Sequence, residues 1–65
     1  MTTDRAYLSE GETARYLSMS VAWLRRRRLQ RLPPAWAKLG RSVRYHVSDV
    51  DEYARSRRVP VREAQ

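Results

Sequence analysis

Two consecutive prolines near the middle of the chain, Pro33 and Pro34, divide it into parts that must fold differently. Neither proline has an amide hydrogen, and the residue before a proline avoids the helical region, so a helix that precedes them ends by Leu32. Before the prolines the apolar residues are spaced as in helices, and after them apolar and polar residues alternate. The pair therefore predicts helices on its N-terminal side and a β-hairpin on its C-terminal side.

The residues from Leu8 to Ser18 are predicted to form a short first helix. Ser9 is a suitable N-cap, and Glu12 three positions later completes a capping box. Ser20 is the expected N-cap of a second helix, which runs from Val21 to about Gln30. Two short helices joined by about three residues are typical of a helix-turn-helix.

From Ala35 to Val47 the apolar residues recur at every second position, and Gly40-Arg41-Ser42 supplies the turn of a β-hairpin. A third helix is expected to begin with Ser48 as its N-cap and to end near Arg58. Acidic residues lie in its first turn and arginines towards its end, as the helix dipole favours.

The expected hydrophobic core is small. Burial of one large apolar side chain contributes about 1.5–3 kcal/mol, so we expect a stability of only a few kcal/mol, and no residues remain to enclose a substrate. The expected core residues are Leu8, Ala14, Leu17, Met19, Val21, Leu24, Leu29, Leu32, Trp36, Leu39, Val43, Tyr45, Val47, Val50, Tyr53 and Ala54.

The charge is unevenly distributed. The net charge is +7, and the stretch from Thr13 to Ser48 contains nine cations and no acidic residue. Thirteen of the fourteen cations are arginine, whose planar guanidinium suits phosphate and guanine. A basic middle between acidic ends is typical of a domain that binds nucleic acid. The alternative is a basic surface that only faces solvent.

Other function classes have little support. The chain has no cysteine and a single histidine, His46, so we expect no metal site and no cofactor. It has no apolar run long enough to cross a bilayer and no signal peptide, so we expect a cytoplasmic protein that binds no membrane. Its serines and carboxylates occupy helix-start positions, so we expect no enzyme activity.

The second helix carries the candidate DNA contacts. A helical wheel places Val21, Leu24, Leu29 and Leu32 on the buried side. It turns Trp23, Arg26, Arg27 and Gln30 outward, with Arg25, Arg28 and Arg31 beside the buried stripe. The second helix of a helix-turn-helix enters the major groove, so Ala22, Trp23 and Arg26 are candidates for base contacts. Arg25, Arg27 and Arg28 are candidates for phosphate contacts. Trp23 could instead fill the core.

The hairpin provides a second set of candidates around its turn: Lys38, Arg41, Ser42 and Arg44. Arg41 at the tip is the preferred contact with the DNA backbone or the minor groove. Lys38 and Arg44 could instead form a solvent-exposed face.

The segments "YLSEGETARYLSMSVAWLRRR" and "PPAWAKLGRSVRYHVSDVDEY" resemble the excisionase and AlpA-like group of small proteins, relatives of the MerR DNA-binding domain. The most specific match is "KLGRSVRYHVSDVDEY", from Lys38 to Tyr53. The resemblance implies a mainly α, MerR-like winged helix-turn-helix with a β-hairpin wing. Ala22, Trp23 and Arg26 take the recognition-helix positions, and Gly40-Arg41 forms the wing tip. Ser18 replaces a frequent glycine of the relatives, and the loop after the second helix also lacks their usual glycine.

The resemblance implies a domain organisation and a function. Residues 1–7 would be a flexible N-terminus, residues 8–58 a winged helix-turn-helix DNA-binding domain, and residues 59–65 a tail. Excisionases (recombination directionality factors) bind adjacent sites on double-stranded DNA cooperatively, bend the DNA and steer an integrase towards excision of a mobile element. Head-to-tail self-association on DNA and a nucleoid location in a prokaryotic or phage-infected cell would follow. One alternative is an AlpA-type transcriptional regulator. Another is an interaction module such as an anti-repressor or RNA binder.

Overall fold

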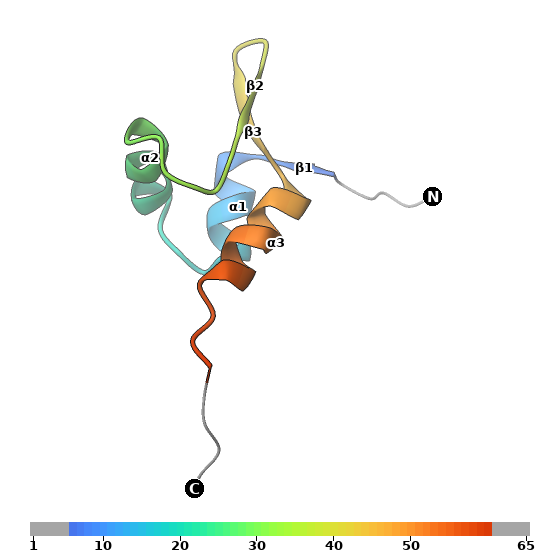
Figure 1. The fold of residues 1–65 in the computed structure, drawn as a ribbon. Coiled ribbons are helices and arrows are strands. Elements are labelled where there is room, and N and C mark those ends of the chain that lie inside the picture. Colours follow the sequence, from blue (N-terminus) through green and yellow to red (C-terminus); the bar gives the residue numbers. More distant parts are fainter. Residues whose placement is uncertain (1–5, 61–65) are drawn as a thin grey trace, which may run out of the picture.

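The computed structural model describes residues 6–60, which form three helices and a three-stranded antiparallel sheet (Figure 1). In chain order the elements are β1 (Tyr7–Leu8), α1 (Glu10–Tyr16), α2 (Val21–Leu29), β2 (Ala37–Leu39), β3 (Ser42–His46) and α3 (Val47–Ser56). The sheet has the order β1-β3-β2, and its β2–β3 hairpin projects beyond the helices (Figure 1). The predicted fold class, a winged helix-turn-helix, is confirmed.

The first helix begins as the capping box predicted. The Ser9 hydroxyl accepts a hydrogen bond from the Glu12 amide at 3.1 Å, and the Glu12 carboxylate accepts one from the Ser9 amide at 2.9 Å. After α1 the chain turns through Ser18, whose φ of 58° lies in the left-handed region. Ser18 therefore takes a conformation that glycine adopts most readily, and the connection to α2 stays short.

The predicted start of α2 and the predicted wing are also present. The Ser20 hydroxyl accepts a hydrogen bond from the Trp23 amide at 3.0 Å and caps α2. In the wing, Leu39 pairs with Ser42, which leaves Gly40 and Arg41 as a two-residue turn. Gly40 has a φ of 66°, a conformation that this kind of turn requires and that glycine adopts at no steric cost.

Two local expectations were wrong. The N-cap of α3 is His46 and not Ser48, because strand β3 runs directly into the helix and the His46 Nδ1 accepts a hydrogen bond from the Ser48 amide at 3.2 Å. Tyr7, expected in a flexible segment, lies in β1 and pairs with His46. Residues 1–5 and 61–65, which belong to the expected N-terminus and tail, lie outside the described residues.

The core lies where α1, α2, α3 and the base of the wing meet. Its fully buried apolar residues are Ala14, Leu24, Tyr45 and Val50, and the residues packed against them are Leu17, Val21, Trp23, Trp36 and Val43. Tyr45 and Trp36, both expected in the core, attach the wing to the helices. Thr13 and Pro34 are also buried, although neither was expected in the core.

Five residues expected in the core are exposed: Met19, Leu29, Leu32, Leu39 and Ala54. Leu29 is the extreme case, with 80% of its surface exposed. For Leu29 the reason is the rotation of α2, which turns Trp23 and Arg27 towards Tyr53 of α3 instead of facing Leu29 inward. An indole ring and the stem of an arginine cover more apolar surface than one leucine, so packing follows the tryptophan side of the helix.

Candidate nucleic-acid interface

The exposed side of α2, which we call the outward face, carries Ala22, Arg25, Arg26, Leu29 and Gln30. Each of these residues has another of the set three or four positions away, so they share one side of the helix. This side lies opposite the buried Leu24. In a helix-turn-helix the corresponding side of the second helix enters the major groove.

The rotation of α2 changes the predicted set. Arg26 and Gln30 lie on the outward face as expected. Trp23 and Arg27 do not, because both side chains are partly buried against α3. Leu29 joins the outward face, although the pattern of leucines predicted its burial.

Arg26 is the arginine of α2 that the described residues leave without an internal partner. Its side chain is exposed and takes part in no hydrogen bond, ion pair or ring contact within residues 6–60. Between Ala22 and Leu29 it occupies the middle of the outward face. Its donors are therefore available to a ligand outside the chain.

Arg25 and Arg28 are held by one carboxylate of α1. The Arg25 Nε donates to Glu10 Oε1 at 3.0 Å, and the Arg28 Nη2 donates to Glu10 Oε2 at 3.3 Å. The Arg25 side chain is 61% exposed, whereas that of Arg28 is 20% exposed. Arg28 therefore mainly joins α1 to α2. Arg25 combines this contact with terminal nitrogens that make no other hydrogen bond among the described residues.

Arg27 joins α2 to α3 and to the loop that follows α2. Its guanidinium lies 5.2 Å from the Trp23 ring centre and 5.1 Å from the Tyr53 ring centre, both within the range of cation–π attraction. Its Nε donates to the Pro33 carbonyl at 2.6 Å. Three contacts thus hold Arg27 inside the fold.

Burial and hydrogen bonding shift the pKa values of two tyrosines that link the elements. Burial raises the pKa of the Tyr45 hydroxyl, the positive charge of Arg28 lowers it in part, and Glu10 adds to the rise. The hydroxyl of Tyr16 on α1 donates to the Asp51 carboxylate on α3, and this hydrogen bond raises the pKa of Tyr16. Both hydroxyls stay protonated at neutral pH.

The wing distributes its candidate contacts over a tip and two faces. Lys38 and Arg41 are exposed, and Ser42 and Arg44 are partly buried. Lys38 pairs with Val43, so these two side chains share a face, whereas Arg44 lies on the opposite one. Arg44 also donates to the Val43 carbonyl at 2.9 Å. A surface on one side of the wing therefore meets Lys38, and a surface on the other side meets Arg44. Arg41 at the tip is accessible from both sides.

Metal and membrane chemistry find no support in the part of the chain that the structure describes. Residues 6–60 contain no group of three or more metal-ligating side chains close enough to hold an ion. The same residues include no helix of the length and apolarity that a membrane span needs.

The fold and the site define a class. A short connection joins two capped helices, the second helix has an exposed cationic face, and a β-hairpin extends beside it, as in winged helix-turn-helix domains. The chain belongs to the helix-turn-helix domain family, whose model matches residues 7–58. That family covers the excisionase and AlpA-like proteins and supports binding to double-stranded DNA. A search of curated proteins found no match to the chain.

Three features of this surface were not predicted from the sequence: the exposure of Leu29, the role of Glu10, and the backbone conformation of Arg31, whose φ is 57°. A sequence signal existed for one of them. Arg31 follows α2, where helices commonly place a glycine with positive φ. The other two depend on how the helices pack.

Proposed function

We propose that this protein binds specific sequences of double-stranded DNA and acts as an excisionase-type architectural factor. The outward face of α2 would enter the major groove while the tip of the wing contacts the adjacent backbone. The observation that carries the proposal is the position of Arg26. It is an arginine at the centre of the outward face with no internal partner among the described residues.

The roles of the individual residues follow from their surroundings. Arg26 would make a bidentate contact to guanine, with Ala22 beside it against a base edge. Arg25 would contact a phosphate or a base through its terminal nitrogens while Glu10 holds its Nε. Arg41 at the wing tip would bind a phosphate. Gln30 would act at the far end of the same helix face.

The remaining candidate residues would contribute to DNA binding indirectly or through additional backbone contacts. Arg27, Arg28 and Trp23 would act on DNA through the orientation of α2, because their side chains contact other parts of the chain. Beside Arg41, Ser42 would make a further contact with the DNA backbone. Only one of the two cations Lys38 and Arg44 would do so as well, since they lie on opposite faces of the wing.

Paired substitutions test DNA binding. The double variant Arg26→Ala/Arg41→Ala should bind a selected duplex at least about tenfold more weakly, because a lost guanine contact costs about 1–3 kcal/mol and the lost phosphate contact adds to it. The matched control, Arg55→Ala/Arg58→Ala, removes the same charge from the last turn of α3 and the residues just after it, and this end of α3 points away from the wing (Figure 1). Equal affinities of the two double variants would contradict the proposed interface.

Salt dependence gives an independent measure. Each phosphate contact adds about −0.9 to the slope of log affinity against log salt, so about six contacts give a slope near −5. A slope near −1 would mean that the basic surface contributes little. Preference for single-stranded RNA over the duplex would favour the alternative of an RNA binder.

The excisionase role rests on the resemblance and has its own test. A duplex with several selected sites should give a ladder of discrete complexes with positive cooperativity, and circular-permutation mobility should reveal a bend. Where an integrase gene lies beside this one, addition of that integrase should then promote excision. A single unbent complex together with altered promoter activity would instead favour an AlpA-type transcriptional regulator.

A further inference from the structure

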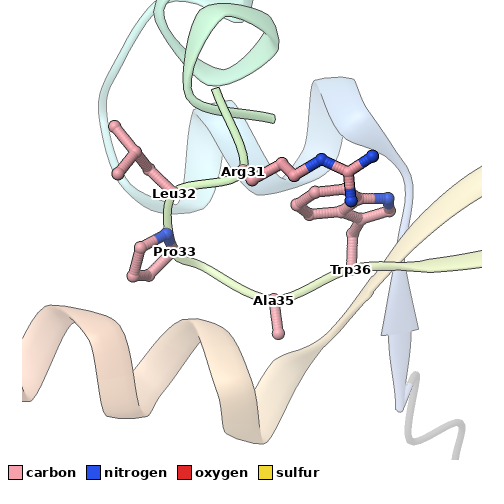
Figure 2. A pocket seen from close by; sticks show the side chains of 5 residues that line it. All are labelled: Arg31, Leu32, Pro33, Ala35 and Trp36. Atoms are coloured by element: carbon pink, nitrogen blue, oxygen red, sulfur yellow. The ribbon is translucent and has the colours of Figure 1, made fainter. Parts of the chain in front are cut away.

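The loop between α2 and β2 forms an open groove beside the proposed interface. Its volume is about 370 Å³, and its lining consists of Arg31, Leu32, Pro33, Ala35 and Trp36 (Figure 2). The loop crosses from the end of α2 to the base of the wing (Figure 1). The groove therefore lies between the two elements that the proposed function places on DNA.

The backbone at Arg31 is in an unusual conformation. Its φ of 57° lies in the left-handed region, where glycine is favoured and a residue with a Cβ is strained. Two hydrogen bonds define the turn, from the Arg31 amide to the Arg28 carbonyl at 3.0 Å and from the Leu32 amide to the Arg27 carbonyl at 2.8 Å. Because glycine would form this turn without strain, the backbone conformation gives no reason for an arginine at this position.

What arginine provides at this position, and glycine would not, is a long cationic side chain. It is exposed, and Figure 2 shows it extending over the groove towards the ring of Trp36. Among the described residues it has no hydrogen-bond, ion-pair or ring partner. The guanidinium donors are therefore available to a ligand at the rim of an otherwise apolar groove.

The Trp36 side of the groove is attached to the core. Trp36 packs against the hydrophobic core and immediately precedes β2, so its position is tied to that of the wing. Its ring is partly exposed and offers an apolar surface. A cation beside an apolar wall suits a deoxyribose–phosphate unit, whose sugar is largely apolar and whose phosphate carries the charge.

We propose that Arg31 and Trp36 form a binding site for the sugar–phosphate backbone of DNA, between the recognition helix and the wing. Arg31 donates to the phosphate, and the sugar packs on Trp36. The strained backbone is retained because the side chain contributes to binding. This proposal rests on the proposed function and adds a third point of attachment to α2 and the wing tip.

The variant Arg31→Gly separates binding from folding, because it removes the guanidinium and relieves the backbone strain in one step. We expect an unchanged or higher melting temperature together with about tenfold weaker DNA binding and a salt slope smaller by about 0.9. The matched control, Arg58→Gly, removes one exposed cation beyond α3 and should leave both quantities at their wild-type values.

The indole N–H resonance of Trp36 gives a direct readout in ¹⁵N-labelled protein. It should shift on titration with a selected duplex in the wild type and shift much less in Arg31→Gly, with Trp23 as an internal reference. Wild-type affinity, slope and Trp36 shift in Arg31→Gly would overturn the proposal. Normal DNA binding of this variant combined with loss of binding to an acidic peptide would also overturn it, by assigning the groove to a protein.

These outcomes differ from a failure of the proposed function. If the groove is idle but α2 and the wing bind DNA, Arg26→Ala still weakens binding while Arg31→Gly does not. If the proposed function is wrong, the wild-type protein itself shows no duplex binding at moderate salt.

Discussion

Replacement of Arg27 tests most directly whether an arginine of α2 contacts DNA or stabilises the fold. Alone among the four consecutive arginines, Arg27 contacts two aromatic rings and a backbone carbonyl, and these contacts connect α2 to α3 and to the following loop. We expect Arg27→Ala to destabilise the fold, and to weaken DNA binding only through the altered position of α2.

The magnitude follows from the contacts that are lost. Two cation–π contacts at a partly exposed site contribute about 0.5–1 kcal/mol each. The hydrogen bond from the charged Nε to the Pro33 carbonyl adds about 1 kcal/mol in solvent. Arg27→Ala should therefore cost about 2–3 kcal/mol, a large part of the roughly 3–5 kcal/mol that a domain of this size has in total.

The assay is thermal unfolding followed by circular dichroism, with DNA titrations at several salt concentrations. A loss of 2–3 kcal/mol corresponds to a fall in melting temperature of about 10–20 °C for a chain of this length. Arg27→Lys keeps the charge but loses the planar group, so it should show about half of that fall. At a temperature where the variants remain folded, the salt slope should stay at its wild-type value.

The opposite pattern would refute this reasoning. If Arg27→Ala keeps the wild-type melting temperature and its salt slope shrinks by about 0.9, Arg27 is a phosphate contact. Full rescue of the affinity by Arg27→Lys would support the same conclusion, because a phosphate accepts either cation.

Three further substitutions test other parts of the site. Glu10→Gln should lower the stability by about 1 kcal/mol in chemical denaturation, because the mostly buried Arg28 loses its charged partner; unchanged stability would mean that this ion pair contributes nothing. Leu29 on the outward face should contact a thymine methyl group, so replacing one thymine of the selected site by deoxyuridine should weaken wild-type binding several-fold but leave Leu29→Ala unaffected. Equal sensitivity of both proteins would exclude this contact. The raised pKa of Tyr45 means that the folded state favours the neutral hydroxyl, so this contribution to stability is complete below about pH 10 and is lost as the pH rises further. Tyr45→Phe should reduce that alkaline loss while changing the stability at neutral pH by less than about 1 kcal/mol, and an identical alkaline profile would contradict the assignment.

The local structure was predictable from the sequence because it depends on residues close together in the chain. The Ser9 and Glu12 capping box, the Ser20 cap and the Gly40-Arg41 turn each involve contacts over a few residues. The cap of α3 was wrong because His46 can also serve as a cap when a strand leads straight into a helix. Strand β1 was missed because two residues carry no detectable alternation.

By itself, the sequence determined the order of the three helices and the hairpin, the position of the wing and the positive charge between the two acidic ends. Only the tertiary structure decided which arginines are available to DNA. The packing of Trp23 and Arg27 on α3 sets the rotation of α2, and Glu10 on α1 engages Arg25 and Arg28. These contacts join residues of different elements, so the spacing of residues within one helix cannot show them, and they leave Arg26 on the outward face without an internal partner.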